Sequence, residues 1–218
     1  MPIEDRYYVR DFIKNHGPFD ALIHLAAMTS IPPCEQDPDK AFRINVHGTR
    51  NVVEEAVNAN PNCYIMHAST PCIFPGRIGD MYDEDSHALP KNMYGLTKYV
   101  SELMVQLSTK NHLIFRANFV PYARYAYPKA FSDRYGTYLF AHQVAEAIVE
   151  LLEKRIIGIV HIVGEDKISM HDLARMCPDS THVKPMTIDD YEGNHKLTMN
   201  MSMSTKYWHP YKIRGTVI

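Results

Sequence analysis

Three side chains in the middle of the sequence have the types and the spacing that proton transfer at a carbonyl requires. Tyr94 and Lys98 are four positions apart, which puts them on one face of a helix, and Thr70 follows an apolar run upstream. A phenol has a reference pKa of about 10 and is a poor acid–base catalyst near neutral pH. A cation one helical turn away favours the phenolate, so we expect Lys98 to lower the pKa of Tyr94.

Alternating strands and helices are expected to position these side chains. The predicted strands lie at residues 21–27, 63–69, 112–119 and 158–163, and the predicted helices at residues 4–16, 37–60, 92–109 and 138–154. Alternation of this kind is typical of β-α-β units with a parallel sheet and right-handed crossovers. The sequence therefore predicts an α/β fold with flanking helices, in which Thr70 follows a strand and Tyr94 lies in the first turn of a helix.

The composition limits the partners. Of the 218 residues, 45% are hydrophobic and 22% are charged, with a formal net charge of −2. Binding to a phosphate backbone requires a strongly basic surface, so we do not expect nucleic acid as a partner. The apolar runs are far shorter than the roughly 20 residues that cross a bilayer, and the N-terminus lacks a signal-peptide pattern. We therefore expect no membrane span and a cytoplasmic location.

The cysteines and histidines show neither a disulfide pattern nor a metal-binding pattern. The cysteines have no CxxC spacing and are interpreted as free thiols, namely Cys34, Cys63, Cys72 and Cys177. The twelve histidines form neither HxH nor HExxH, which predicts no metal site. His24 and His67 lie in predicted strands and are interpreted as core histidines. For Asn45 two interpretations stay open, a functional buried amide and an ordinary amide on a helix face.

Four sequence blocks occur in an order and spacing shared with one enzyme family. The blocks are residues 24–29 followed by Asn45, Ser69-Thr70 followed by Phe74, residues 90–98 followed by Glu102, and residues 116–118. Together they resemble the extended short-chain dehydrogenases/reductases, also described as NAD-dependent epimerases/dehydratases, and within them the dTDP-4-dehydrorhamnose reductases. The resemblance covers nearly the whole chain and implies a Rossmann-like parallel sheet.

The resemblance implies a role for each member of the trio. Thr70 would hydrogen-bond the C4 oxygen of a sugar, Tyr94 would transfer its proton, and Lys98 would also bind the nicotinamide ribose. The implied activity is NAD(P)H-dependent reduction, or epimerisation, of a nucleotide-linked 4-keto-6-deoxy sugar, with NADP or NAD as the cofactor. The alternative is a non-catalytic homologue that binds a sugar nucleotide or regulates another enzyme and has lost cofactor binding.

The resemblance also implies which residues line the site and how the chain is divided. Small residues at the carboxyl ends of adjacent strands let a dinucleotide approach the backbone. The implied cofactor contacts are Ala26, Ala27, Ala68, Ser69 and Lys98, and the implied substrate contacts are Thr29, Thr70 and Phe119. Residues 1–165 are expected to form a truncated Rossmann-like core with an insertion near residues 121–137, and residues 166–218 a small C-terminal substrate-side region.

Members of this family begin with a strand, a glycine-rich turn and a helix, for which the sequence shows no counterpart. Those elements would precede Met1, so the resemblance implies that roughly 50 residues of one nucleotide-binding half are absent. We then expect the chain alone to bind a dinucleotide weakly or not at all. The strand at Ala21–Ala27 would become a sheet edge, and we expect a second copy, another chain or a rearranged N-terminal helix to cover it.

Overall fold

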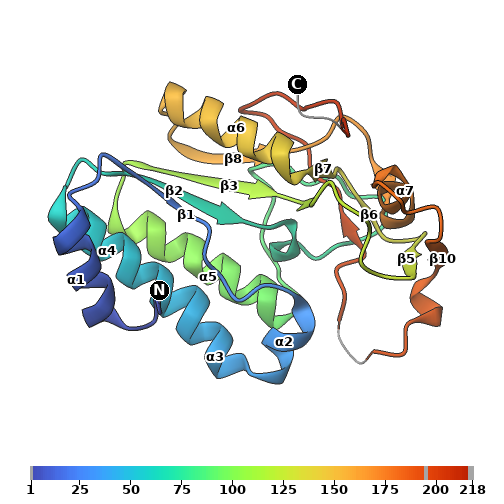
Figure 1. The fold of residues 1–218 in the computed structure, drawn as a ribbon, viewed down its shortest axis with the longest axis horizontal. Coiled ribbons are helices and arrows are strands. Elements are labelled where there is room, and N and C mark those ends of the chain that lie inside the picture. Colours follow the sequence, from blue (N-terminus) through green and yellow to red (C-terminus); the bar gives the residue numbers. More distant parts are fainter. Residues whose placement is uncertain (1, 194–195, 216–218) are drawn as a thin grey trace.

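A four-stranded parallel sheet forms the centre of the computed structural model, which describes residues 2–193 and 196–215 (Figure 1). In spatial order the strands are β1 (Ala21–His24), β2 (Tyr64–Ser69), β3 (His112–Ala117) and β8 (Gly158–Ile162). Each neighbouring pair is parallel, and the register pairs His24 with His67. The predicted α/β fold with a parallel sheet is confirmed.

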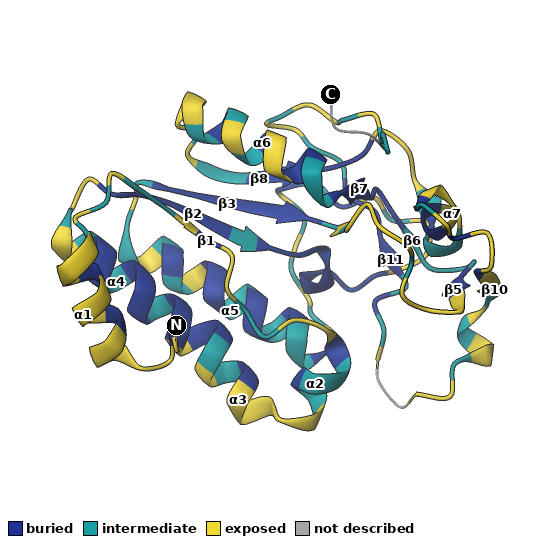
Figure 2. Ribbon diagram, viewed as in Figure 1, coloured by how far each residue is buried: buried dark blue, intermediate teal, exposed yellow. Residues whose placement is uncertain are grey.

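Helices cover both faces of the sheet (Figure 1). On one face lie α1 (Arg6–His16), α4 (Thr49–Ala59) and α5 (Met93–Ser108), and on the other lies α6 (Ala141–Lys154). Figure 2 shows the inner strands β2 and β3 largely buried and the outer faces of the helices exposed. Strands covered on both faces need apolar residues at successive positions, which explains the continuous apolar runs in the sequence.

The predicted helix at residues 37–60 is continuous but changes its winding. It begins with α3 (Pro38–Phe42), passes through a π-helical turn (Arg43–Gly48), and continues as α4. Asp37 caps its start by accepting a hydrogen bond from the amide of Lys40 at 2.9 Å. The wider turn contains Asn45, whose side chain is fully buried. Turns of this kind often serve to place a side chain at a functional site.

Three predicted boundaries differ from the structure at the carboxyl end of the sheet. β1 ends at His24, so residues 25–30 form a loop. The predicted strand at residues 112–119 divides into β3 and β4 (Phe119–Val120), and the predicted helix at residues 138–154 begins only after β7 (Leu139–Phe140). β4 pairs with β7. The pairing of β4 with β7, outside the central sheet, keeps the apolar residues of both strands extended. Local periodicity in the sequence does not predict such a pairing.

The C-terminal region forms small sheets beyond the carboxyl end of the central sheet. Its elements are β9 (Ile168–Ser169), α7 (Met170–Met176), β10 (Lys184–Met186), a short 3-10 turn (Ile188–Asp190) and β11 (Asn200–Met201). β10 pairs with β5 (Lys129–Phe131), while β9 and β11 flank β6 (Tyr135–Gly136). The predicted insertion near residues 121–137 therefore provides the strands on which the C-terminal strands assemble.

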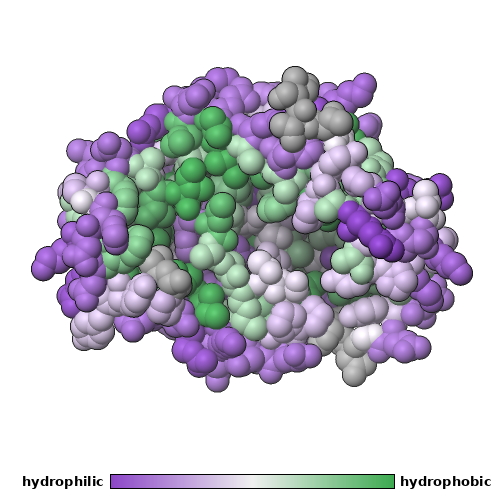
Figure 3. All heavy atoms as spheres, in the orientation of Figure 1, coloured by the Kyte–Doolittle hydropathy of each residue, from purple (hydrophilic) through white to green (hydrophobic). Residues whose placement is uncertain are grey.

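β1 lies at the edge of the central sheet. Among the described residues, no strand pairs with its outer side. Ile23 is 40% exposed and Leu25 60% exposed, and a groove of about 450 Å³ runs beside them. Figure 3 shows apolar atoms gathered on this face of the molecule, between the α6 layer and the α1 layer. The edge strand therefore presents both unpaired backbone groups and apolar side chains.

The cysteines are free thiols, as predicted, and all of them are buried. Within the described ranges, no helix is both long and apolar enough to cross a membrane. The same residues contain no cluster of three or more histidine, cysteine or acidic side chains arranged to hold a metal ion.

Candidate active site

A cavity of about 730 Å³ lies at the carboxyl end of the sheet, between the central strands and the C-terminal region. Most of the predicted site residues line it, namely Ala27, Thr29, Ala68, Ser69, Thr70, Tyr94, Lys98 and Phe119. Ala26, in the loop that follows His24, lines the groove beside β1 instead. The cavity therefore brings together the predicted trio and nearly all of its predicted surroundings.

The backbone that follows β2 holds Thr70 in place. A short 3-10 helix (Pro71–Ile73) begins there, and Thr70 caps it, because its Oγ1 accepts a hydrogen bond from the Cys72 amide at 3.2 Å. Gly95, in the first turn of α5, lies directly against this segment, where a Cβ atom would collide with the carbonyl oxygen of Cys72. The missing side chain lets Tyr94 approach Thr70, and the two form a hydrogen bond.

The first turn of α5 is anchored by two side chains outside the trio. Asn92 caps the helix, since its Oδ1 accepts a hydrogen bond from the amide of Gly95 at 2.9 Å. The carboxylate of Glu35, on α2 (Ile31–Gln36), accepts a hydrogen bond from the amide of Met93 at 2.6 Å. A carboxylate at a helix N-terminus also complements the helix dipole. These contacts orient Tyr94, which is half-buried.

The pKa of Tyr94 shifts in the direction opposite to our prediction. Burial raises the pKa of the phenol well above its usual value, Cys72 adds to the rise, and the hydrogen bond with Thr70 opposes it. Lys98 is itself buried, and burial lowers the pKa of its ammonium to about 8, with Glu102 opposing. Its Nζ lies 3.3 Å from Nε2 of His67. The shift in the pKa of Tyr94 is therefore decided by desolvation, while Lys98 faces His67.

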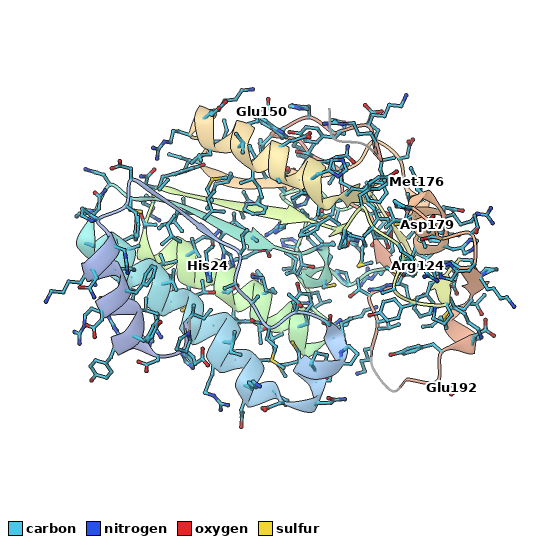
Figure 4. All side chains as sticks on the ribbon, in the orientation of Figure 1. His24, Arg124, Glu150, Met176, Asp179 and Glu192 are labelled. Atoms are coloured by element: carbon cyan, nitrogen blue, oxygen red, sulfur yellow. The ribbon has the colours of Figure 1, made fainter. Side chains whose placement is uncertain are left out.

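Two histidines lie beneath Lys98, on the face of the sheet that α4 and α5 cover. The rings of His24 and His67 are stacked, with their centroids 5.3 Å apart. Figure 4 labels His24, between β1 and the layer of α4 and α5. Burial lowers the pKa of His24 to about 3 and that of His67 well below its usual value, with Lys98 adding to both effects. Both rings are thus neutral near pH 7, as expected for core histidines.

A buried ion pair fixes α5 on the sheet beside the trio. The guanidinium of Arg116, on β3, donates two hydrogen bonds to Glu102, at 3.0 Å from Nε and 2.7 Å from Nη2. The hydroxyl of Ser69 also donates to Glu102. A bidentate pair of this kind restricts both the position and the rotation of the helix. Because Glu102 lies one turn after Lys98, the pair also fixes the height of the ammonium above the sheet.

Asn45 ties the loop after β1 to α5. Its amide donates to the carbonyl of Met28 at 3.0 Å and to the hydroxyl of Thr97 at 2.9 Å, and its carbonyl accepts from the amide of Met28 at 2.7 Å. All the hydrogen bonds of this buried amide thus lead to residues that flank the cavity. The contacts favour a structural role beneath the site over that of a free amide on a helix face.

The structure adds one residue that our sequence reasoning did not single out. Arg134 lines the cavity from the C-terminal side. Its Nε donates to the carbonyl of Thr198 at 2.9 Å, and the nearest partners of its other nitrogens are the sulfurs of Met170 and Met201, at 4.0 Å and 3.5 Å. Within the described ranges, no carboxylate pairs with this guanidinium. Only its position in the insertion near residues 121–137 could have drawn attention to it.

The lining fits one end of a nicotinamide cofactor. An ammonium beside small side chains, as Lys98 lies beside Ala27 and Ala68, leaves room for a ribose and offers it hydrogen-bond donors. The pyrophosphate of such a cofactor is commonly bound by a glycine-rich turn between a strand and a helix. The described residues contain no such turn, since Gly76 and Gly79 lie in an irregular loop that follows the 3-10 helix.

Comparisons with known proteins agree with this geometry. Residues 1–127 match the model of the RmlD substrate binding domain family. The spore coat polysaccharide biosynthesis protein SpsK of Bacillus subtilis is 29% identical over 212 residues, which cover 89% of this chain and 73% of that protein. The dTDP-4-dehydrorhamnose reductase of Salmonella typhimurium is 28% identical over 189 residues, which cover 78% of this chain and 62% of that protein.

A solved structure agrees in fold. The dTDP-4-dehydrorhamnose reductase of Bacillus anthracis, determined in complex with NADP, superposes with a TM-score of 0.84 at 19% identity, covering 94% of this chain and 78% of that one. The chain thus spans between 62% and 78% of the length of these three proteins. The resemblance noted in the sequence is confirmed: the chain belongs to the RmlD substrate binding domain family, among homologues of the dTDP-4-dehydrorhamnose reductases.

Proposed function

We propose that this chain catalyses the NAD(P)H-dependent reduction of a nucleotide-linked 4-keto-6-deoxy sugar. The observation that carries the proposal is the convergence of Thr70, Tyr94 and Lys98 on the wall of one cavity at the carboxyl end of the sheet. Ligands of open parallel sheets commonly bind at this end. Membership of the family and the names of the reductases among its relatives support the substrate class.

The protonation state of Tyr94 suits reduction. Because burial raises its pKa, the phenol keeps its proton at neutral pH and has it ready for a carbonyl oxygen. The Oγ1 of Thr70 accepts from the Cys72 amide. The O–H of Thr70, which hydrogen-bonds Tyr94 in the free chain, would donate to the same substrate oxygen once a substrate is bound. In the reduction, the carbonyl carbon gains a hydride and its oxygen gains the proton of Tyr94. The phenolate then recovers a proton from solvent.

The cofactor in this proposal is NADP or NAD, and when bound it supplies the hydride. Lys98 would hold the nicotinamide ribose, and Ala27, Ala68 and Ser69 would contact the same end of the molecule. To reach such a ribose, the Lys98 ammonium would turn away from His67 and into the cavity that Tyr94 also lines. That movement would lower the pKa of Tyr94 only when the cofactor is present.

Arg134 is proposed to bind the phosphates of the substrate. The reactive trio lines the cavity from the end of β2 and from α5, and this guanidinium lines it from the segment between β5 and β6. Among the described residues, its terminal nitrogens hydrogen-bond only methionine sulfurs, which are weak acceptors, so a phosphate would gain strong charge-assisted hydrogen bonds there. Thr29 and Phe119 line the same cavity. Residues 166–218 would then act as the substrate-side region.

The experiment is a pair of measurements on the purified chain. Calorimetric titration with NADPH and NADH tests cofactor binding, and consumption of NADPH with a dTDP-4-keto-6-deoxy sugar tests turnover. Micromolar affinity together with turnover would support the reductase. Absence of heat at millimolar cofactor, with no turnover, would overturn the proposal for this chain. Formation of an epimerised ketone without consumption of NADPH would instead indicate epimerisation.

A second candidate function is a non-catalytic sugar-nucleotide-binding or regulatory homologue. The observation that favours it is the lack, within the described residues, of a glycine-rich turn for a pyrophosphate. This candidate predicts that a dTDP-sugar binds while NADPH and NADH do not. In that case an Arg134→Met variant would lose dTDP-sugar affinity and a Tyr94→Phe variant would retain it.

The open edge of the sheet leads to a proposal about assembly. We propose that a second copy or another chain covers the outer side of β1, because an unpaired edge with exposed Ile23 and Leu25 promotes association. Sedimentation at several concentrations tests this proposal, and an Ile23→Lys variant should weaken self-association. A monodisperse monomer at high concentration, with β1 amides that exchange rapidly with solvent, would contradict coverage of the edge.

A further inference from the structure

The buried histidine beneath Lys98 has more neighbours than one ring nitrogen can satisfy in a single protonation state. Nε2 of His67 lies 3.3 Å from Nζ of Lys98 and 2.9 Å from Oγ of Ser101. Nδ1 of the same ring is buried and has no hydrogen-bond partner among the described residues. Because His67 is fully buried, an unsatisfied arrangement of its ring nitrogens is costly.

The hydroxyl of Ser101 settles which group donates to which. Its single proton is used in a hydrogen bond of 2.7 Å to the carbonyl oxygen of Lys98, one helical turn earlier. The Ser101 oxygen is therefore available to Nε2 of His67 only as an acceptor. This hydrogen bond requires that Nε2 carry the ring proton.

A charged Lys98 requires the opposite protonation of Nε2 of His67. A charged ammonium has three donors and no acceptor, so it can bond to Nε2 only if Nε2 is bare. The ring proton is then on Nδ1, where it has no partner. A neutral amine, by contrast, has a lone pair that tolerates an Nε2–H. Each charge state of Lys98 is thus compatible with one tautomer of His67.

We propose that the tautomer of His67 is coupled to the charge of Lys98, so that His67 acts as a positioning residue that sets when this lysine is charged. With Lys98 charged, the ring proton lies on Nδ1 and Nε2 accepts from Nζ. With Lys98 neutral, the ring proton lies on Nε2 and bonds to Ser101. Lys98 and His67 together release one proton when Lys98 becomes neutral, because the His67 ring carries one proton in both states.

The surroundings place this change in an accessible pH range. Burial lowers the pKa of Lys98 to about 8 and keeps His67 neutral. The other ionisable groups that face the pair are His24 from β1, which is also neutral, and Glu102 from α5. Glu102 is itself neutralised by Arg116 from β3. No charged group among them replaces His67 as a direct partner of the Lys98 ammonium in the described structure.

Long-range proton–nitrogen NMR spectra of the full chain with ¹⁵N-labelled histidine test the coupling directly, between pH 6 and pH 10. We expect His67 to be the Nδ1–H tautomer at the lower end and to become the Nε2–H tautomer with a midpoint near pH 8. His112 is an internal reference, because its Nδ1 bonds to the carbonyl of Thr109 at 2.7 Å and so keeps its proton. One unchanging tautomer of His67 over the whole range would overturn the proposal.

Two variants sharpen the test. Lys98→Met removes the ammonium, so His67 should be Nε2–H at every pH. Ser101→Ala removes the acceptor that favours the neutral-lysine state, so the midpoint should rise by about one pH unit. A midpoint that does not move in Ser101→Ala would contradict the assignment of Ser101. If Lys98→Met does not fold, the wild-type and Ser101→Ala spectra still decide the question.

The catalytic consequence rests on the proposed function, whereas the coupling itself does not. If the chain is a reductase, the upper limb of its pH–kcat profile should follow the midpoint of the His67 change and move with it in Ser101→Ala. A chain without turnover but with the tautomer change would disprove the reductase and leave the coupling intact. Turnover with a fixed His67 tautomer would support the reductase and disprove the coupling.

Discussion

The two walls of the cavity are built in different ways. The wall that carries Thr70, Tyr94 and Lys98 belongs to the central sheet and a 16-residue helix, and it is held by the Arg116–Glu102 pair. The second wall carries Arg134 in the segment between β5 and β6, beside short strands of two or three residues and with methionine sulfurs as neighbours. Buried, bidentate contacts fix the first wall, whereas flexible thioethers allow the second to adapt. The difference suggests that the chemistry is held rigid while recognition of the substrate can vary.

The largest effect should come from the phenol on the rigid wall. Tyr94→Phe removes the proton donor and should lower kcat by about 100- to 10,000-fold, while sugar-nucleotide affinity changes little. Steady-state kinetics and calorimetry measure the two quantities. Tyr99→Phe, on the same helix and outside the cavity lining, is the matched control and should behave as wild type. Normal turnover by the Tyr94 variant would show that the rigid wall does not carry the acid.

The next effect concerns the buried Arg116–Glu102 ion pair, which holds that wall in place. Glu102→Gln leaves the Arg116 guanidinium buried without a carboxylate, which should lower the free energy of unfolding by about 3–5 kcal/mol. Glu150→Gln disrupts the exposed pair with Lys154 and should change the free energy of unfolding by no more than about 0.5 kcal/mol. Chemical denaturation compares the two variants. Equal, small effects would mean that the central pair does not hold α5 on the sheet.

A third prediction concerns the pH dependence of the rigid wall. The folded pKa of Lys98, about 8, lies below its unfolded value of 10.5, so the unfolded chain binds more protons between these values. The contribution of Lys98 to stability should therefore rise with pH across that window, by up to about 3 kcal/mol. Denaturation of wild type and Lys98→Met at several pH values isolates this contribution. A pH-independent difference between them would indicate that Lys98 has an ordinary pKa.

The smallest predicted effect lies on the adaptable wall. Arg134→Met should raise the KM for the nucleotide sugar by about 10- to 100-fold and leave kcat within a few-fold, because it acts on binding and lies away from the reacting oxygen. Arg175→Met, an exposed arginine on α7, is the matched control. A fall in kcat with an unchanged KM would place Arg134 in the chemical step and remove the contrast between the walls.

Local patterns in the sequence were enough for much of the rigid wall. Tyr94 and Lys98 lie four residues apart on a helix, as predicted, and the central strands begin within one residue of their predicted starts. These features depend on periodicity and capping, which act over a few residues. The π-helical turn around Asn45 was not predictable in this way, because its winding depends on contacts with Met28 and Thr97.

The sequence alone identified the ancestry, the parallel sheet and the residues able to transfer a proton, since each of these follows from residue types at short spacings. The electrostatics depended on the assembled structure. Burial reversed the expected shift in the pKa of Tyr94, and packing turned the Lys98 ammonium towards His67. Arg134 lines the same cavity as the trio because β6, the strand that follows it, pairs with strands more than 30 residues away in the chain. Desolvation and long-range pairing are properties of the folded chain, which no local pattern reports.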